Sequence, residues 1–397
     1  MNIGNIKYYL IRGLSDFFPR NKHLWITGKI TGWEYSNHPP MFFDNSKYFF
    51  LYLVNETDEK VYWMSDSEEE IKMLQEMNLP VVKFNSMRGK WLVARAKYSF
   101  HHYGPNQINR ILQFGAVQID FWHGTPLKKI RYDVIPKEEH KANPLATHYM
   151  KSGCEYIAST SEFLSKKVLC GAFAAEDWQM LNFGYPRMDI MKYDKETIKK
   201  FCKRYSKSLL PYIESSEGKK VFLYMPTFRD DDIDYFEKAG INYGRLNDKL
   251  EENNAVFFLK LHPLTKNINI EKYDNIIQIS NDIDIYPFLK FVDYLITDYS
   301  SIFFDFLPLD KEILFIPYDY ENYVKKRQLY FDYDEITPGK KYKSFDEFIE
   351  DIDIIDKLDY SYKRRKIRNL FITNYNFDAC ERTYNFFKNI NERKKKK

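Results

Sequence analysis

The sequence predicts an α/β protein built from two Rossmann-like domains that face a central cleft. Short apolar runs of strand length alternate with helical segments in both halves of the chain, which is typical of a parallel sheet covered by helices. The 397 residues exceed what one hydrophobic core usually holds, so two domains are expected. Polar residues directly follow the apolar runs in both halves, at the strand ends where open α/β sheets bind ligands.

Composition narrows the class of protein. Hydrophobic residues make up 44% and charged residues 29%, as in a globular chain, and the net charge of +4 is too small for a nucleic-acid binder selected by charge. Four cysteines without a C-x-x-C pair favour buried thiols in a reducing compartment over disulfides or zinc. No apolar run approaches about 20 residues, and no apolar region fits a secretory signal, so we expect neither a membrane span nor export. The aromatic content of 18% could serve cores, sugar stacking or a membrane interface.

The N-terminal segment, residues 1–22, has an amphipathic pattern with basic residues between the apolar ones. Two interpretations remain open: a helix packed on the following domain, or a helix lying on an anionic membrane surface. The apolar positions at helical spacing are Ile6, Leu10, Leu14, Phe17 and Phe18.

The first predicted domain covers residues 23–205. Helices are expected over 44–53 and 69–77 and from Ser161 onward, while the run 90–94 fits either a strand or a helix. A further helix is expected to begin at Thr125-Pro126, because threonine is a good N-cap and proline suits the first turn. Residues 99–104 read as a loop. The strand-like runs are 23–28, 61–64, 81–84, 117–121 and 156–161.

The second predicted domain covers residues 206–385, and a basic tail follows over 386–397. The boundary falls within a charged, helical stretch, 192–218. A short helix is expected at 287–289. The strand-like runs are 221–225, 255–261, 276–279, 294–297 and 313–316.

His123 is the first candidate for chemistry. It directly follows the apolar run 116–121 and precedes the expected helix start, which places it at the carboxyl end of a strand. A histidine in that position can transfer protons near neutral pH. The alternative is a histidine that only completes the end of the strand.

The second half has its own polar residues after strands. Thr297-Asp298-Tyr299-Ser300-Ser301 opens a helix whose unpaired N–H groups and serine hydroxyls suit a phosphate, although ordinary serine capping explains the same pattern. His262 follows the run 255–261 and could stabilise a departing phosphate, or it could simply be fixed by Pro263. Lys128 and Lys260 are weaker phosphate candidates.

Arg229 also follows a strand directly and could bind a phosphate with two hydrogen bonds. The alternative is a surface salt bridge with the acidic residues 230–232. This triplet resembles a divalent-metal site, but adjacent aspartates cannot all face one ion, so a solvated loop is favoured.

Five motifs occur in a characteristic order. Together they resemble the CDP-glycerol glycerophosphotransferase family, which includes the teichoic-acid primases and polymerases and related capsule polymerases. Segments 44–47 and 330–333 also fit, whereas Gln328 stands where a glycine is expected. The motifs are Phe121-Trp122-His123-Gly124-Thr125-Pro126-Leu127-Lys128, Gly184-Tyr185-Pro186-Arg187, Pro226-Thr227-Phe228-Arg229, Lys260-Leu261-His262-Pro263 and Thr297-Asp298-Tyr299-Ser300-Ser301.

The resemblance implies a GT-B-like enzyme that moves a polyol phosphate, first of all glycerol phosphate, from a CDP-activated donor to an acceptor hydroxyl. CMP would be released during synthesis of a teichoic-acid-like or capsular polymer. His123 would be the base, and His262 would act at the donor phosphates. The residues implied as donor contacts are Arg229, Thr227, Lys260, Thr297, Asp298, Ser300 and Ser301, and those implied elsewhere in the cleft are Trp122, Gly124, Thr125, Lys128 and Arg187.

The implied partners are CDP-glycerol or CDP-ribitol as donor, a lipid-linked or polymeric acceptor and an anionic membrane surface, without nucleic acid. The loop 100–105 is expected to shape the acceptor side. No bound catalytic metal is expected, because arginine, histidine and a helix N-terminus can neutralise a diphosphate. The expected location is cytoplasmic, peripheral on the inner face of the bacterial cell membrane. Basic clusters at 363–366 and 394–397 could attract anionic lipid, or could be solvated.

Two other functions remain open. A GT-B glycosyltransferase would use a nucleotide sugar and usually release a nucleoside diphosphate rather than CMP. A membrane-surface scaffold would keep the fold without turnover, but the presence of both histidines together with the phosphate-binding set disfavours it.

Overall fold

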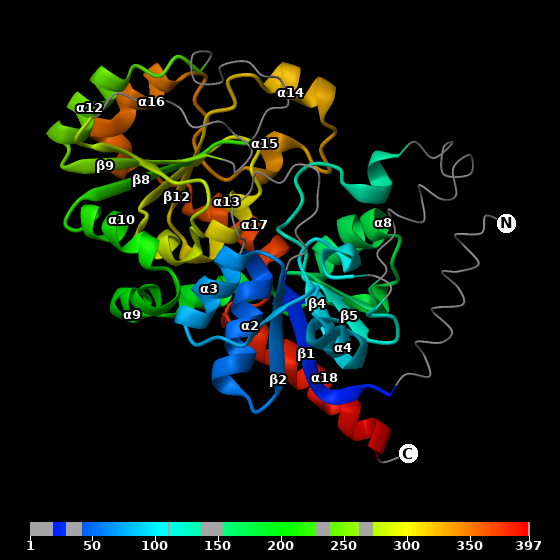
Figure 1. The fold of residues 1–397 in the computed structure, drawn as a ribbon. Helices are drawn as coiled ribbons and strands as arrows, with labels where there is room; N and C mark the ends of the chain where they lie inside the picture. The colour runs from blue at the N-terminus through cyan, green and yellow to red at the C-terminus, as the bar shows by residue number, and fades with distance from the viewer. Residues whose placement is uncertain are drawn as a thin grey trace. The chain divides into compact units, whose positions relative to one another are not determined.

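The computed structural model describes residues 19–28, 42–109, 112–135, 154–227, 239–261 and 273–395. They form two compact units, each a parallel sheet with helices (Figure 1). Unit 1 consists of Met1–His123, Arg131–Lys192 and Thr373–Lys397, and unit 2 of Gly124–Ile130 and Tyr193–Ile372. Most of the helix predicted over residues 1–22 lies outside the described residues, and its last two positions already belong to the first strand.

Unit 1 is built on a seven-stranded parallel sheet of order β3-β2-β1-β4-β5-β6-β7. The order reverses between β1 and β4, as in a Rossmann fold, and ligands of such sheets bind at the carboxyl ends of strands beside the reversal. The strands are β1 (Asn21–Gly28), β2 (Lys60–Ser65), β3 (Val81–Lys83), β4 (Ala96–His101), β5 (Val117–Asp120), β6 (Tyr156–Ala158) and β7 (Met180–Leu181).

The helices of unit 1 include those predicted at 44–53, 69–77 and from Ser161, which are confirmed. The described helices are α2 (Asp44–Glu56), α3 (Glu68–Glu76), α4 (Met87–Arg95), α7 (Glu162–Leu164), α8 (Cys170–Phe173) and α18 (Ala379–Lys395). Shorter turns are η1 (Pro105–Gln107), η2 (Arg131–Val134), the π-helical η3 (Ser165–Leu169), η4 (Asp177–Gln179) and η5 (Pro186–Lys192).

The prediction of a loop over residues 99–104 is wrong for its first half. Ala96–His101 form β4, which pairs with both β1 and β5 in the middle of the sheet. Ser99 and His101 are polar, but both are fully buried. The Ser99 hydroxyl is satisfied by Gln113 Oε1 at 2.6 Å, so the core accommodates its polarity.

The prediction of a helix from Thr125 is also wrong. Residues 124–130 are extended, and Lys128 forms an antiparallel bridge with Leu329. Lys129 N donates to Gln328 O at 2.8 Å, and Tyr330 N donates to Leu127 O at 3.0 Å. The backbone groups that would close a first helical turn are therefore used by a partner segment far along the chain.

Unit 2 contains a five-stranded parallel sheet of order β10-β9-β8-β11-β12, which again reverses, here between β8 and β11. All five predicted strands are confirmed. They are β8 (Lys220–Met225), β9 (Ala255–Lys260), β10 (Ile276–Ile279), β11 (Tyr294–Thr297) and β12 (Glu312–Phe315). Their continuous apolar runs fit a parallel sheet buried on both faces.

The helices of unit 2 are mostly short, and the one predicted at 287–289 is a 3₁₀ helix. The α-helices are α9 (Lys195–Tyr205), α10 (Leu210–Ser215), α12 (Tyr243–Glu252), α13 (Ile302–Phe306), α14 (Tyr320–Lys326), α15 (Tyr333–Ile336), α16 (Phe345–Asp351) and α17 (Ser361–Phe371). The 3₁₀ helices are η6 (Lys207–Leu209), η7 (Tyr286–Phe291), η8 (Leu307–Leu309) and η9 (Ile352–Lys357).

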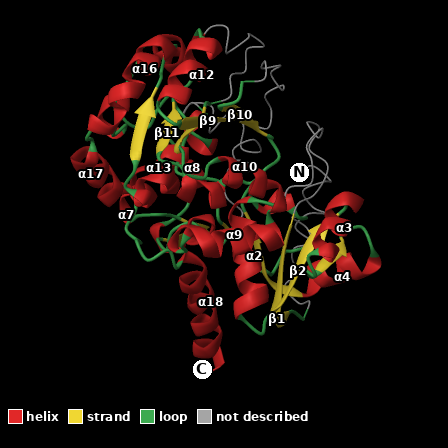
Figure 2. Ribbon diagram, turned by 90° about the vertical axis from the view of Figure 1, so that its left-hand side faces the viewer, coloured by secondary structure: helices red, strands yellow, loops and turns green. Residues whose placement is uncertain are grey.

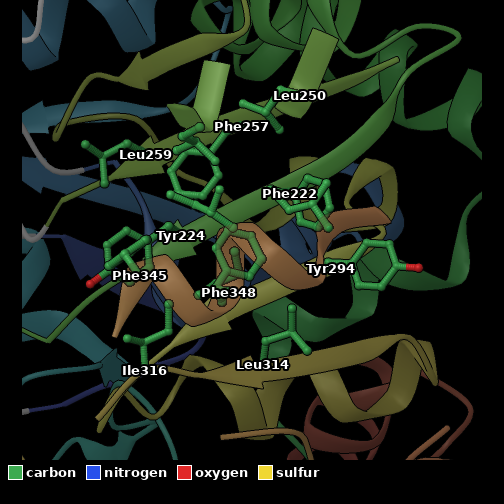
Figure 3. Close-up of a cluster of buried hydrophobic side chains, with 14 of the residues drawn as sticks. Phe222, Tyr224, Leu250, Phe257, Leu259, Tyr294, Leu314, Ile316, Phe345 and Phe348 are labelled. Carbon is green, nitrogen blue, oxygen red and sulfur yellow. The ribbon is translucent and has the colours of Figure 1, made fainter. Parts of the chain in front are cut away.

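Aromatic side chains fill the core of unit 2. Figure 3 shows α16 placing Phe345 and Phe348 against the sheet. The Phe345 ring meets Tyr224 edge-on at 5.0 Å, and Phe348 meets Phe222 at 5.8 Å. Part of the high aromatic content of the sequence therefore lies in this core, where aromatic pairs stabilise the fold beyond the burial of their surface.

The chain passes from unit 1 to unit 2 between Lys192 and Tyr193, at the start of the stretch 192–218 that is expected to contain the domain boundary. Helix α9, assigned to the first domain, belongs to unit 2, where Lys195 lies 5.4 Å from the Phe291 ring of η7. Helix α18 belongs to unit 1 (Figures 1 and 2), where Phe387 packs 6.0 Å from the buried Trp25 ring. The local sequences of α9 and α18 do not indicate which of the two sheets each helix packs against.

Among the described helices, none is both long and apolar enough to cross a bilayer.

Candidate active site

His123 lies three residues beyond the end of β5, as predicted, and a sharp turn presents it there. Trp122 takes a left-handed conformation with φ +52°, which is rare for a bulky residue. Its N–H donates to Asp120 Oδ1 at 2.9 Å, and its carbonyl accepts from Asn45 Nδ2 at 2.8 Å. Gly124 follows with φ +141°, a conformation that favours glycine. The side chains of Asp120 and Asn45 therefore bind both backbone groups of Trp122 and hold the turn directly before His123.

The His123 ring has a defined tautomer. Its Nδ1 lies 3.1 Å from the carbonyl oxygen of His102, which can only accept a hydrogen bond. Nδ1 therefore carries the proton in the neutral ring, and Nε2 keeps its lone pair. The half-buried ring also packs against Trp122 at 3.8 Å and lies 5.0 Å from Tyr103. This arrangement leaves Nε2 as the atom that can take a proton.

Burial lowers the pKa of His123 to about 4. The nearby Asp44 carboxylate and the bond to the His102 carbonyl oppose this shift, while Arg187 and Arg131 add to it. His123 is consequently neutral at physiological pH, as a general base must be.

A buried ion pair supports the turn from below. Arg187 Nη1 lies 2.7 Å from Asp44 Oδ1 and also donates to the carbonyl oxygen of His123 at 3.1 Å. Asn45 Oδ1 accepts from Arg187 N at 3.1 Å. Although burial raises the pKa of Asp44, the Arg187 guanidinium and two histidines outweigh it and hold that pKa below its ordinary value. Arg187 thus binds both the Asp44 carboxylate and the backbone of His123.

The loop after β4 completes this side of the site. His102 Nδ1 lies 2.7 Å from Ser46 Oγ, and Gln107 Oε1 accepts from the N–H groups of His102 and Tyr103. Gln107 Nε2 donates to Gly28 O at 2.6 Å, which ties the loop to the end of β1. The loop predicted to shape the acceptor side therefore does reach His123.

Asp44, Asn45 and His102 lie in the segment 44–47 and the loop 100–105, for which the sequence predicts no role of individual residues, and Gln107 lies outside both. The sequence does contain one indication of these roles. The polar residues 44–47 stand at the start of the otherwise apolar helix α2, and all four are buried. Polar residues that cannot face solvent must find partners inside the protein.

In unit 2 the reversal point of the sheet is held by Asp298. Its Oδ1 accepts from Thr227 N at 2.8 Å, which links the ends of β8 and β11, and also from Tyr299 N. The Thr297 hydroxyl donates to Met225 O at 2.7 Å. The structure thus brings Thr227, Thr297 and Asp298 together, but the side chains of the last two are engaged with backbone groups.

Ser300 and Ser301 precede α13, which confirms the predicted helix start. Both are half-buried, and the Ser300 hydroxyl accepts from Ile302 N at 3.4 Å. They are the more accessible members of this motif, since Thr297 and Asp298 are fully buried.

Lys260 and the 124–130 segment occupy other positions in unit 2. Lys260 is buried at the end of β9, and its Nζ donates to Ser280 O at 2.9 Å. Burial lowers its pKa to about 8, against the opposing effect of Asp282 and Asp284. Thr125 is buried, and Lys128 is half-buried in the strand-like pairing described above.

Three predictions lie outside the described residues: Arg229, His262 and the acidic triplet 230–232. Within the ranges that the structure does describe, no three histidine, cysteine or carboxylate side chains are grouped as ligands for one metal ion.

Known proteins match nearly the whole length of the chain. The family model of CDP-Glycerol:Poly(glycerophosphate) glycerophosphotransferase matches residues 21–387. A teichoic acid poly(glycerol phosphate) polymerase of Bacillus spizizenii is 28% identical over 366 residues, 87% of this chain and 86% of the relative. A teichoic acid ribitol-phosphate polymerase of Staphylococcus aureus, TarL, is 32% identical, over 50% of this chain and 38% of its own length.

The fold is that of a solved polymerase. The structure of the wall teichoic acid polymerase TagF covers 99% of this chain, and the chain covers 96% of it, with a TM-score of 0.74 and 23% sequence identity. A TagF structure soaked with CDPG gives a TM-score of 0.76 at 21% identity. The predicted α/β, GT-B-like fold is confirmed by this match. The chain belongs to the CDP-glycerol:poly(glycerophosphate) glycerophosphotransferase family.

Proposed function

We propose that this protein transfers a polyol phosphate from a CDP-activated donor to an acceptor hydroxyl and releases CMP. The observation that carries the proposal is the neutral His123 ring, whose Nδ1 proton is committed to the His102 carbonyl and whose Nε2 can accept a proton. Membership of the glycerophosphotransferase family supports it.

The reaction balances with His123 as the base. The acceptor hydroxyl gives its proton to His123 Nε2 while its oxygen forms a bond to the phosphorus that carries the polyol. The bond from that phosphorus to the bridging oxygen breaks, and CMP leaves with the electron pair. A positioned general base typically contributes about 10²–10⁴-fold to such a rate.

The donor phosphates are assigned to unit 2. Its sheet reverses between β8 and β11, and ligands of open α/β sheets bind beside such a reversal. Ser300 and Ser301 would contact phosphate oxygens, as would Arg229 and His262. Thr297 and Asp298 would shape the loop, because their side chains already bind the backbone.

Glycerol phosphate is the favoured transferred group, and the ribitol-phosphate relative makes CDP-ribitol the second donor to test. The acceptor would be the hydroxyl of a lipid-linked or polymeric polyol phosphate in a teichoic-acid-like or capsular polymer. A lipid-linked acceptor requires work at the inner face of the cell membrane. Exposed Arg365 and Lys366 on α17 could attract its anionic lipids, whereas the neighbouring Arg364 is buried in ion pairs with Glu312 and Asp310.

A donor screen tests the proposal. CMP release would be measured from CDP-glycerol, CDP-ribitol and a nucleotide sugar, with a lipid-linked polyol phosphate as acceptor. We expect CMP from a CDP-polyol and its loss in His123→Ala. The matched control is His23→Ala, which removes an exposed histidine of β1 that lies 3.3 Å from Glu59. Release of a nucleoside diphosphate, or full CMP release by His123→Ala, would contradict the assignment.

A further inference from the structure

Helix α4 of unit 1 has an exposed face that the proposed reaction does not use. Met87 is 87% exposed and Trp91 is 58% exposed. They are four residues apart, so they lie on one side of the helix, one turn from each other. At these exposures most of each side chain lies outside the core of unit 1.

The opposite side of α4 fixes its orientation. Val93 and Gly89 are buried against the sheet. A Cβ atom on Gly89 would lie 2.3 Å from Lys83 O and 2.6 Å from Phe84 O, so only glycine permits this close approach. The outward direction of Met87 and Trp91 is therefore built into the fold.

The exposed face is basic as well as apolar. Helix α4 carries Arg88, Lys90 and Arg95 and no acidic residue. The Arg95 guanidinium lies 5.7 Å from the Trp91 ring, and that of Arg88 lies 5.8 Å from the Tyr62 ring. Near the start of α4, Glu68 is paired with Lys83, and Asp66 accepts hydrogen bonds from Asn85, so both carboxylates are engaged. An aromatic ring with basic residues around it suits the headgroup region of a bilayer.

A second observation concerns the start of the chain. Arg20 Nη1 donates to Val93 O at 3.3 Å and to Ala96 O at 3.1 Å, so the residue directly before β1 is fastened to the last turn of α4. The sequence before it has the amphipathic, basic pattern for which a helix packed on the domain and a helix on an anionic membrane both remain open.

We propose that the outer face of α4, formed by Met87, Arg88, Lys90, Trp91 and Arg95, docks unit 1 on an anionic lipid bilayer. The inference rests on the membrane association proposed above and names the surface responsible. Trp91 and Met87 enter the headgroup region, and the three basic residues bind lipid phosphates. A stable protein partner would usually need about 800 Å² from each side, which two apolar side chains on a nine-residue helix do not supply, whereas a bilayer needs no such area.

Vesicle flotation of the full chain tests the proposal. The vesicles contain phosphatidylglycerol and phosphatidylcholine, or phosphatidylcholine alone, without a lipid-linked acceptor. We expect the wild type to float with the anionic vesicles only, and Met87→Ser/Trp91→Ser to weaken binding at least about tenfold, since both apolar groups are lost. Arg88→Gln and Lys90→Gln should each weaken it about fivefold, and added salt should act in the same direction.

Trp178 provides the matched control. It is 66% exposed in unit 1, but it follows Glu176 and Asp177, so its surroundings are acidic. Trp178→Ser should float like the wild type. Brominated lipid should quench tryptophan fluorescence in the wild type and in Trp178→Phe, but much less in Trp91→Phe. CMP release with a soluble acceptor should be unchanged in every α4 variant, which shows that each one is folded.

Two results would overturn the inference. One would exclude only α4 as the docking surface, and the other would also exclude the proposed membrane association. If the wild type binds but Met87→Ser/Trp91→Ser binds equally well, α4 is not the docking surface, and a loss confined to an Arg365→Gln/Lys366→Gln variant would assign it to α17. If the wild type does not bind anionic vesicles at all, the proposed membrane association fails together with α4. The assignment of polyol phosphate transfer is unaffected by either result, because it is measured separately as CMP release.

Discussion

The polar residues at the strand ends of the two sheets differ in how their side chains are hydrogen-bonded. In unit 1, His123 projects from a turn held by Asp120, Asn45 and Arg187, and its Nε2 retains a lone pair. In unit 2, the side chains of Thr297 and Asp298 bind backbone groups of neighbouring strands. A polar side chain at a strand end can thus keep a lone pair for a reaction, as we propose for His123, or be bound to the backbone, as Thr297 and Asp298 are. The difference can be tested by removing members of each set.

The largest effect is expected for the two histidines. His123→Ala should lower the rate of CMP release by about 10²–10⁴-fold, and His262→Ala should cost a similar factor, through loss of the base and of charge stabilisation respectively. The free energy of unfolding should barely change in either variant. Rates would be measured at saturating donor and acceptor, with His23→Ala as the control.

The state of His123 can be measured directly. With a pKa of about 4, the ring should remain neutral from pH 7 down to about pH 5 and become protonated only below that. Activity that depends on the neutral ring would therefore be lost only on the acid side of this range. An NMR titration would follow the histidine ring resonance that His123→Ala removes. A midpoint near 6.5, the ordinary value, would contradict the picture of a buried ring.

The buried ion pair between Asp44 and Arg187 is expected to make a large contribution to the free energy of unfolding. Asp44→Ala leaves the Arg187 guanidinium buried without its carboxylate, and breaking a buried pair in this way costs about 3–5 kcal/mol. The double variant Asp44→Ala/Arg187→Met removes both charges and should recover part of that loss, but it should remain poorly active because the His123 carbonyl has lost its donor. Glu162→Ala, which breaks an exposed pair with Lys166, is the control and should leave the stability nearly unchanged. If Asp44→Ala is as stable as the wild type, the buried pair contributes no more to stability than the exposed pair.

Asp120 should show its effect through pH. Burial raises its pKa to about 6, above the ordinary value of 3.8, although Arg131 opposes the shift. The folded state therefore binds the proton more readily than the unfolded state, and this group adds stability as pH falls from about 6 toward 4. Asp120→Asn keeps an acceptor for Trp122 N without the buried charge, so it should be more stable than the wild type by about 1–3 kcal/mol at pH 7.

Denaturant unfolding at several pH values would follow this difference. The gap between Asp120→Asn and wild type should close as the pH approaches 4. A gap that stays constant with pH would mean that the carboxyl group does not titrate in this range.

The smallest effect is expected at Thr297. Thr297→Val leaves the Met225 carbonyl without its hydroxyl donor and should lower stability by about 1 kcal/mol with little change in CMP release. Ser300→Ala should do the reverse, because its hydroxyl is assigned to the donor phosphates. Thermal unfolding and donor KM would be measured for both. A large rise in donor KM for Thr297→Val would make this threonine a donor contact after all.

Local pattern predicted much of the fold. The continuous apolar runs of β8, β9 and β11 were recognised as strands because a parallel strand is buried on both faces. The pattern failed at β4, whose Ser99 and His101 are polar but buried, and at Thr125, whose capping signal is overridden by pairing with residues 328–330. Both failures come from partners that are distant along the chain.

The amino-acid sequence by itself determined the α/β class, the two repeats of the strand and helix rhythm, the position of His123 after a strand and the family to which the chain belongs. Only the tertiary structure decided which polar residues are held by the fold, which helix covers which sheet and which nitrogen of His123 carries the proton. The reason is physical: strand and helix periodicity is a local property, whereas a hydrogen-bond partner such as His102 or Arg187 reaches the site only once the chain has folded.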